Sequence, residues 1–366
     1  MENLSSTLES ICRRFRIVGE WRGYEELKAG HINNTYHVSF YSEEKGEKSY
    51  VLQRINMHVF KNPRFIMQNI DLITRHIAEK KEGASLHFHH TEDGLNYYVE
   101  SGDFWRIYTY VPGTTFNEAS SPESMNAAGR AFGAFQQYLS DFDATQLKET
   151  IPDFHNTRQR YENLFHSVID DPCGRVRFVK EDLFYVQSIR DIACRITELA
   201  QAGTFPVRVT HNDTKTNNVL LDSETLEPRC VIDLDTVMPG LIMHDFGDAI
   251  RFGANTAAED ESDLSKVSID LNLFRAFTEG FIGTTASMLT EPELENMALG
   301  AVTMTLECGI RFLDDYLSGD QYFKIAYPDH NLIRARCQFA LAKDMIAHLD
   351  DLNGIVREVY GNSLHV

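Results

Sequence analysis

Two short strand-like runs with a polar loop between them constrain this chain more than any other feature. The first run, residues 206–209, leads into a His-x-Asp turn that ends at Asp213, and Asn218 follows five residues later. The second run, residues 231–232, ends on the carboxylate of Asp233. Apolar runs of this length bounded by turn residues are typical of buried strands. The pattern therefore predicts two strands that deliver Asp213, Asn218 and Asp233 to one site.

These residue types at this spacing are typical of phosphoryl transfer. One Asp accepts a hydrogen bond from the attacking hydroxyl, and a second carboxylate with an amide oxygen holds Mg²⁺ against nucleotide phosphates. Asp213 fits the catalytic role, and Asn218 and Asp233 fit the metal role. Asp235 would share a face with Asp233 in an extended strand, where it could bind a second metal ion or position Asp233. An ordinary loop is the alternative, because Asp and Asn are common turn residues.

The loop resembles that of the aminoglycoside phosphotransferase and choline kinase superfamily, relatives of protein kinases that phosphorylate small molecules. Their pattern is His-Gly-Asp-x-x-x-x-Asn followed by Ile-Asp, and Asn212 replaces the Gly here. Further segments extend the resemblance over nearly the whole chain, and together they are similar to the bacterial N-acetylhexosamine 1-kinases: residues 30–36, 50–53, 232–240, 244–253 and 307–313. That resemblance implies ATP and Mg²⁺, and the anomeric C1 hydroxyl of N-acetylglucosamine or N-acetylgalactosamine as the acceptor.

The resemblance implies an α+β, protein-kinase-like fold of two lobes. We expect a small N-terminal lobe with an antiparallel sheet, its strands at residues 35–40, 49–55, 86–90, 95–99 and 104–111. A helix is expected to begin at Asn62-Pro63, with isoleucines recurring on one face. The larger lobe should be mostly helical, over residues 121–140, 158–166, 183–202, 271–281, 291–317 and 330–358.

Pro112 and Gly113 break the strand pattern, and we place the interlobe hinge there. Residues 1–111 would then form the nucleotide-binding lobe, and residues 112–366 the catalytic and substrate-binding lobe. By analogy with kinases, the adenine ring would read backbone groups near Tyr110 and Val111.

The resemblance also assigns the turn around Gly30, Asn33 and Asn34 to the nucleotide phosphates. Glycine suits that position because the backbone must come close to the ligand. An ordinary hairpin turn is the alternative, since no complete Gly-x-Gly-x-x-Gly is present.

Gln53 stands where much of the superfamily has a Lys that contacts the phosphates. A neutral amide donates hydrogen bonds but brings no positive charge. Another cation such as Arg54, or the metal, must then offset the phosphates. Asp71 is the nearest acidic candidate for the helix partner of that Lys.

For the acceptor, the resemblance places Arg311 and Tyr322 near the sugar, with His31 and Arg251 as further candidates. A sugar site needs several hydrogen-bonding side chains beside a flat aromatic or apolar surface. The alternatives are a solvated helix residue for Arg311 and a core aromatic for Tyr322.

Two further polar residues of this region are expected to be structural. His211 should brace the loop rather than titrate. Asp245 belongs to a kinase-like Asp-Phe-Gly, but it follows Asp233 by about a dozen residues, whereas the superfamily's metal carboxylate ends the strand after the catalytic loop.

Composition narrows the partners. The formal net charge of −19 disfavours nucleic acid, but it leaves ATP possible because a metal and backbone N–H groups can bind phosphates locally. No apolar stretch approaches the ~20 residues that span a bilayer, and the first residues are polar, so we expect a cytoplasmic protein without a membrane partner. The six cysteines form no Cys-x-x-Cys pair, which argues against a zinc knuckle. No feature indicates an oligomeric state.

Three functions remain open at this point. The first is an N-acetylhexosamine 1-kinase, and the second is a kinase of choline, homoserine, an aminoglycoside or methylthioribose. The excess of acidic residues would suit a cationic substrate of the second kind. The third is an inactive nucleotide-binding protein, which would explain Gln53, although the intact set of Asp213, Asn218 and Asp233 argues against it.

Overall fold

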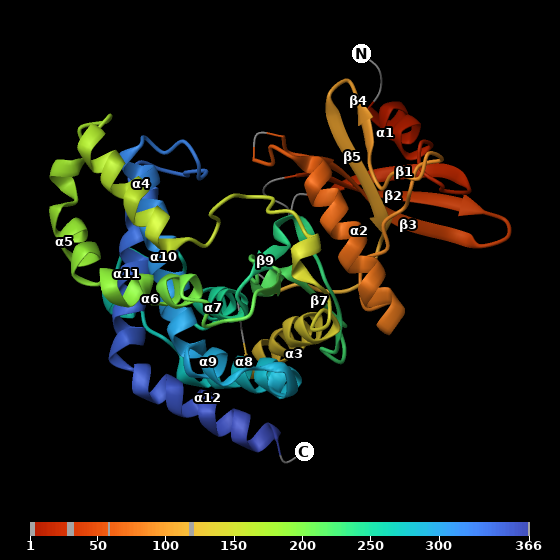
Figure 1. Ribbon diagram of the computed structural model, residues 1–366. Helices are drawn as coiled ribbons and strands as arrows, with labels where there is room; N and C mark the ends of the chain where they lie inside the picture. Colours follow the sequence, from red (N-terminus) through yellow and green to blue (C-terminus); the bar gives the residue numbers. More distant parts are fainter. Residues whose placement is uncertain (1–3, 28–32, 58, 117–120, 365–366) are drawn as a thin grey trace.

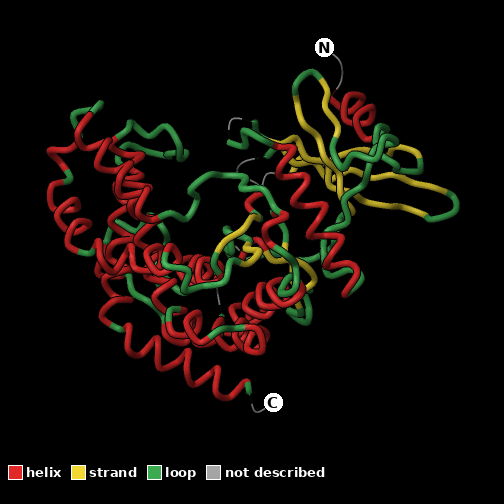
Figure 2. Tube along the Cα trace, viewed as in Figure 1, coloured by secondary structure: helices red, strands yellow, loops and turns green. Residues whose placement is uncertain are grey.

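The computed structural model describes residues 4–27, 33–57, 59–116 and 121–364. Within these ranges an antiparallel five-stranded sheet occupies the N-terminal part, and helices make up most of the rest (Figure 1). Figure 2 shows the long strands gathered at one end of the molecule and most of the helices at the other. The predicted α+β architecture, with a small sheet lobe and a larger helical lobe, is confirmed.

The sheet has the order β1-β2-β3-β5-β4, and each neighbouring pair is antiparallel. Its strands are β1 (Glu20–Leu27), β2 (Asn34–Ser42), β3 (Gly46–Ile55), β4 (Tyr98–Glu100) and β5 (Asp103–Thr109). One face buries Val38, Leu52 and Ile107 in a cluster with helix α1 (Leu4–Cys12). Successive residues of a strand point to opposite faces, so Gln53 and Arg106 lie on the other face, toward the rest of the protein.

Helix α2 (Pro63–Lys80) begins where the sequence predicts. Pro63 occupies the first turn, although the Asn62 side chain forms no capping hydrogen bond. The predicted apolar stripe is buried in the main hydrophobic core, through Ile66, Ile70, Ile73 and Ile77.

The predicted strand pair at residues 86–90 and 95–99 is wrong. Residues 86–90 are extended, but they lie alongside β5, where His89 N–H donates to Ile107 O and Thr109 N–H donates to His87 O. β5 offers this free edge beyond the short β4, so the segment pairs with it and not with the residues that follow. The strand β1 and helix α1 were not predicted. β1 is mostly exposed or half-exposed and lacks a run of buried apolar residues.

The larger lobe contains long helices at each predicted position. Their bounds are α3 (Pro122–Tyr138), α4 (Thr157–Asp170), α5 (Lys180–Ser188), α6 (Arg190–Gln201), α7 (Ile242–Gly253), α8 (Leu271–Thr285), α9 (Glu291–Glu295), α10 (Met297–Leu317), α11 (His330–Ala347) and α12 (Leu349–Ser363). Three predicted helices are each divided in two, at Ile189, Asn296 and His348. A one-residue break is hard to detect by periodicity, because the apolar positions on both sides keep nearly the same spacing.

Helix α10 lies at the centre of this lobe and is buried along most of its length. It packs against α7, α11 and α4, so it joins several helices of this lobe in one hydrophobic core. Helix α7, which begins three residues before Asp245, was not predicted. In the described part of the chain, no helix is long and apolar enough to cross a membrane.

Candidate active site

Two short ladders hold the polar loop of the sequence motif between the sheet and the helices. Strand β6 (Arg208–Thr210) pairs with β9 (Met238–Gly240), and β7 (Val219–Leu221) pairs with β8 (Pro228–Val231). Figure 1 shows β7 and β9 between the sheet lobe and the main group of helices. Both predicted strands therefore exist, and the loop that follows β6 lies beside the turn that follows β8.

Asp245 and His211 fix the shape of this loop. The Asp245 carboxylate accepts hydrogen bonds from the backbone N–H groups of His211 (2.9 Å) and Asn212 (2.8 Å) and from Gln136 Nε2 (2.7 Å). The His211 ring lies 2.9 Å from the carbonyl oxygen of Ile232, which joins the loop to the end of β8. Both residues were expected to be structural, and these contacts support that expectation.

Asn212 stands where the motif has Gly, and its backbone conformation shows why Asn is tolerated there. Its φ is +64°, in the left-handed region that Gly adopts most readily and Asn tolerates better than most residues. The side chain also donates to Thr236 O (2.9 Å) and accepts from Thr210 Oγ1 (3.0 Å). With a further bond from Nδ2 to Thr210 O (3.2 Å), the Asn keeps the backbone turn that the loop needs and adds three hydrogen bonds.

Asp213 is held by two neighbours in the same loop. Lys215 Nζ lies 2.9 Å from Asp213 Oδ1, and Asn218 Nδ2 donates to Oδ2 at 3.0 Å. Burial acts to raise the pKa of Asp213, but the positive charge and hydrogen bond of Lys215 outweigh it, so the pKa is lowered. The group is a carboxylate at neutral pH, suited to orienting a hydroxyl.

Asp233 lines the space between the lobes. Its backbone is left-handed (φ +58°, ψ +58°), so the chain turns here instead of continuing as a strand. Desolvation in the cleft, followed by the charges of Asp235 and Asp213, raises the pKa of Asp233 to about 7. Three carboxylates close together are a concentration of negative charge that a divalent cation would relieve.

Asp235 does not share a face with Asp233. The prediction assumed an extended strand, but residues 234–236 form a 3₁₀ turn after the left-handed Asp233. The Asp235 carboxylate is 2% exposed. One oxygen pairs with Arg106 Nη1, and the other accepts from Asn33 Nδ2 at 2.8 Å. Both oxygens therefore already have partners from the sheet lobe.

A cavity of about 330 Å³ lies between the sheet and the loop that contains Asp213 and Asn218. Among the residues predicted to bind the nucleotide, Asn33, Gln53, Tyr110 and Val111 line it, together with Asp213, Asn218 and Asp233. Asn34 does not, because its side chain accepts a hydrogen bond from Arg54 Nη2 (3.0 Å) on the exposed side of the sheet. Gly30 and His31 lie outside the described residues.

Two cations of the described chain line this cavity, Arg106 and Lys215, and the sequence pattern predicted neither of them. Arg54 pairs with Asp103 (3.2 Å) and is absent from the lining, whereas Arg106 and Lys215 line the cavity. Both residues have a feature in the sequence that could have identified them. Arg106 is a charged residue in the middle of an apolar strand, and Lys215 stands two positions after Asp213 inside the motif itself. Asp71 pairs with Arg75 and His90 instead of with a residue of the cavity.

The side-chain oxygens of Asn218 and Asp233 suit a magnesium site that is completed by a ligand. Asn218 and Asp233 both line the cavity beside Asp213, and in the described chain no group of three His, Cys, Asp or Glu residues forms a complete metal cage. Mg²⁺ commonly takes one or two protein ligands and completes its coordination with phosphate oxygens and water. Asn218 and Asp233 suit Mg²⁺ shared with a phosphate ligand.

Two of the residues predicted to bind the substrate, Arg311 and Tyr322, lie on helix α10 and in the segment that follows it. His155 connects this helix to the polar loop, because Nε2 lies 3.4 Å from Asn212 O while Nδ1 pairs with Glu307 on α10 at 2.9 Å. Arg311 follows one turn later on α10. Its guanidinium lies 5.4–5.8 Å from the centres of three aromatic rings, those of Phe154, Tyr322 and Phe323.

The structure brings Arg311 and Tyr322 together, whereas the ion-pair partners of Arg251 are two carboxylates. Tyr322 is 60% exposed, which excludes the alternative of a core aromatic. Arg251 is 5% exposed and pairs with Asp248 (2.9 Å) and Glu259 (3.0 Å). Its guanidinium is thus already neutralised by two carboxylates.

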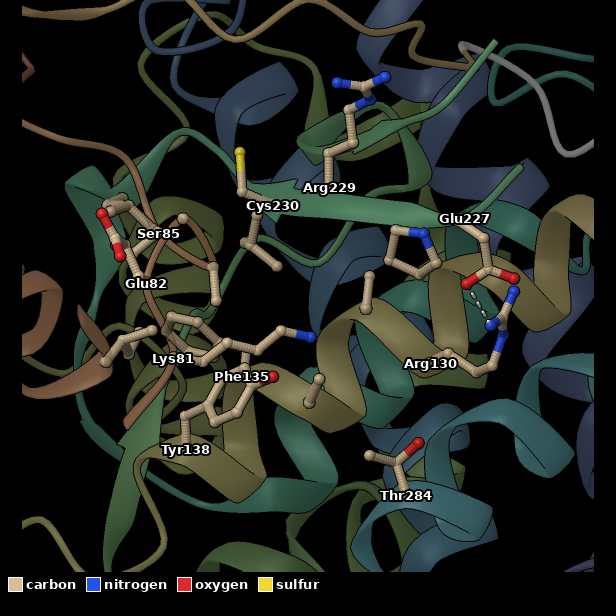
Figure 3. Close-up of a pocket in the computed structure, with 18 residues that line it drawn as sticks. Lys81, Glu82, Ser85, Arg130, Phe135, Tyr138, Glu227, Arg229, Cys230 and Thr284 are labelled. Atoms are coloured by element: carbon tan, nitrogen blue, oxygen red, sulfur yellow. Dashed lines mark hydrogen bonds and ion pairs between the residues drawn. The ribbon is translucent and has the colours of Figure 1, made fainter. Parts of the chain in front are cut away.

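A second cavity, of about 340 Å³, lies away from the motif residues (Figure 3). It is bounded by the end of α2 and the loop after it, by α3, and by β8. Arg130 and Glu227 form an ion pair at one side (2.9 Å), as the dashed line in Figure 3 marks. No residue predicted to bind nucleotide, metal or acceptor lines this space, so the cavity between the lobes is the candidate active site.

Comparison with known proteins gives a family match and several similar folds. Residues 23–266 match the family described as the phosphotransferase enzyme family. Similar solved structures include an aminoglycoside phosphotransferase from Alicyclobacillus acidocaldarius (10% identity, 98% of this chain and 96% of that chain covered, TM-score 0.59). A choline kinase from Cryptosporidium parvum is also similar (10% identity, 96% and 97% covered, TM-score 0.56). So is a spectinomycin phosphotransferase in complex with ADP and spectinomycin (13% identity, 100% of both chains covered, TM-score 0.52). At these identities the structures show the fold alone, and the predicted protein-kinase-like fold is confirmed.

Proposed function

This chain belongs to the phosphotransferase enzyme family, and from that premise we propose that it is an ATP-dependent kinase of N-acetylhexosamines, acting at the anomeric C1 hydroxyl. One observation carries the kinase part of the proposal. Asp213, Asn218 and Asp233 all line the same cavity between the lobes, and phosphoryl transfer uses a carboxylate that orients the nucleophile close to metal-binding oxygens. The choice of acceptor rests on the resemblance of the motifs and on the surroundings of Arg311.

In the proposed reaction, Asp213 orients the acceptor hydroxyl toward the γ-phosphorus of ATP. A new bond forms between O1 of the sugar and phosphorus, the bond from phosphorus to the bridging oxygen of ADP breaks, and the hydroxyl proton passes to Asp213. The lowered pKa of Asp213 makes it a weak base. That suits a loose transition state, in which positioning supplies much of the effect.

Lys215 is well placed to limit repulsion in this step. Its ammonium group lies 2.9 Å from Asp213 and also lines the cavity, so it can offset charge on the transferred phosphoryl group. Asn218 and Asp233 would hold Mg²⁺, which would supply further neutralisation at the phosphates. Tyr110 N–H already donates to Ser49 O (3.0 Å), so we assign adenine recognition to the backbone around Val111.

The surroundings of Arg311 favour a sugar over choline. Aromatic rings that surround a quaternary ammonium group bind it by cation–π attraction. Here the rings of Phe154, Tyr322 and Phe323 already surround the guanidinium of Arg311. A cationic acceptor would meet a positive charge there, whereas hydroxyl and acetamido oxygens would find a hydrogen-bond donor. This supports a neutral, oxygen-rich acceptor.

A panel of acceptors tests the proposal. We expect ATP to be consumed with N-acetylglucosamine and N-acetylgalactosamine but not with choline or homoserine, measured as ADP release. The 1-O-methyl glycosides of both sugars should be inert, because their anomeric oxygen carries no proton and is blocked by the methyl group. Turnover of a methyl glycoside would contradict transfer to C1, and turnover of choline alone would support the second of the three functions.

Arg311→Ala is expected to raise the Michaelis constant for the sugar about 10-fold or more while leaving that for ATP within about twofold. The reason is that Arg311 lies among the aromatic rings proposed to adjoin the sugar and does not line the nucleotide cavity. Steady-state kinetics with each substrate varied in turn provides the measurement. Arg158→Ala, at a half-exposed arginine of α4, is the matched control and should change neither constant. Equal increases in both constants for Arg311→Ala would contradict a role in acceptor binding.

A further inference from the structure

An ion pair crosses from the sheet lobe to the catalytic region. Arg106 on β5 and Asp235 in the 3₁₀ turn after Asp233 are each 2% exposed, and they lie 129 residues apart in the sequence. Burying two charges is unfavourable unless their partners satisfy them. Arg106 lines the cavity that the proposed nucleotide would occupy, so the pair lies at the edge of that cavity.

The neighbours of the pair hold Arg106 in one orientation. Its Nε donates to Gln53 Oε1 (2.9 Å) and its Nη1 to Asp235. Asn33 joins the same group, because it donates to Asp235 Oδ2 (2.8 Å) and accepts from the N–H of Asn56 (2.9 Å). Residues from three separate segments therefore determine where the guanidinium points.

One nitrogen of this guanidinium is left over. Arg106 Nη2 donates to no group among the residues that the structure describes. A guanidinium has five N–H donors, and those of a buried one need acceptors. The side chain lines the cavity, so a ligand in the cavity is the acceptor within its reach.

The charge balance of the cavity points the same way. Its lining includes the carboxylates of Asp213 and Asp233, and Lys215 is paired with the first of these. Nucleotide phosphates would add further negative charge. On the sheet side of the described lining the cation is Arg106, whose pairing with Asp235 occupies Nη1 and leaves Nη2 for a ligand, whereas Arg54 pairs with Asp103 on the other face.

Arg106 is also placed to supply the positive charge that Gln53 lacks. The two residues are direct cross-strand partners on β3 and β5, and both side chains lie on the face toward the cavity. Cβ atoms of such partners are about 4.5–5.5 Å apart, a distance that a long side chain spans easily. A cation on β5 can therefore reach the region served by a cation at position 53.

We infer that Arg106 is the phosphate-binding cation of this chain, and that Asp235 is its positioning residue and not a metal ligand. Arg106 donates to the phosphates through Nη2 while Gln53 and Asp235 hold its other nitrogens. The inference rests on the proposed binding of ATP in this cavity. It also accounts for Gln53 without loss of activity, because the positive charge has moved by one strand.

The test compares a ligand with phosphates and one without. Calorimetric titrations with ADP and with adenosine would be made on the wild-type chain and on the double variant Arg106→Met/Asp235→Asn, which leaves neither charge buried alone. We expect the double variant to bind ADP at least 10-fold more weakly and adenosine within about twofold of wild type. Arg54→Met is the matched control, and it should change neither affinity.

Two further measurements separate a phosphate contact from a structural one. Gln53→Lys added to Arg106→Met should restore most of the affinity for ADP, because it returns a cation to the same face beside Asp235. The gain in ADP affinity on adding Mg²⁺, relative to EDTA, should be the same in the double variant as in wild type, because Asp235 holds no metal. Circular dichroism melting confirms that each variant is folded.

Unchanged ADP affinity in the folded double variant would overturn the inference, as would equal losses for ADP and adenosine. Loss of the Mg²⁺-dependent gain would overturn the assignment of Asp235. A wild-type chain that binds adenosine and ADP equally would also overturn it. If wild type binds neither, the proposed function itself fails.

Discussion

Asp213→Asn is expected to lower the turnover number about 10²–10⁴-fold while changing nucleotide affinity by no more than about twofold. The amide oxygen can still accept a hydrogen bond from Lys215, so the loop should keep its shape. The variant cannot accept the hydroxyl proton and orients the acceptor less well. Steady-state kinetics gives the first quantity, and calorimetric titration with ADP gives the second.

The same substitution at an exposed aspartate controls for general effects. Asp350 lies in the first turn of α12, far along the chain from the motif, and Asp350→Asn should leave turnover unchanged. Near-normal turnover in Asp213→Asn would remove Asp213 from the mechanism. A matching fall in ADP affinity would mean that the substitution disturbs the cavity as a whole.

Asp233→Ala is expected to reduce activity by about 10³-fold or more, and to weaken ADP binding in Mg²⁺ but not in EDTA. The lost interaction runs through the metal ion, so it exists only when the ion is present. In EDTA, removing one of three neighbouring carboxylates also removes repulsion, which is why ADP affinity should hold or rise. Titrations under the two conditions give the comparison.

The EDTA titration distinguishes the loss of a metal ligand from a folding defect. Equal weakening of ADP binding with and without Mg²⁺ would indicate a folding defect at the left-handed turn of residue 233. Asp233→Asn serves as the companion variant, because Asn keeps the left-handed backbone better than Ala does. Both variants should lose the Mg²⁺-dependent part of the affinity.

The fold was predictable where local pattern and packing agree. Helix α2 begins at a proline and buries a regular stripe of isoleucines, so periodicity alone locates it. The segment at residues 86–90 shows the limit of that reasoning. Its apolar residues fit a strand, but its partner is β5 and not the next run in sequence, and such non-local pairing leaves no local signal.

Some parts of the site could be predicted from local spacing, and others could not. Asp213 and Asn218 lie five residues apart in one loop, so their spacing carries the geometry. The position of Asp235 could not be read from spacing, because a single left-handed residue at Asp233 redirects the chain. The contact between Asp235 and Arg106 joins elements 129 residues apart, and only the strand register of β3 and β5 brings Gln53 beside them.

The identity of the product tests the central claim most directly. Phosphorus-31 NMR of a reaction containing the wild-type chain, ATP, Mg²⁺ and N-acetylglucosamine should show ADP and a sugar phosphate whose phosphorus couples to the anomeric proton. Asp213→Asn should give no such signal in the same time. A phosphorus coupled to the protons at C6, or hydrolysis of ATP to inorganic phosphate without any sugar phosphate, would contradict the assignment of this chain as a kinase of the C1 hydroxyl.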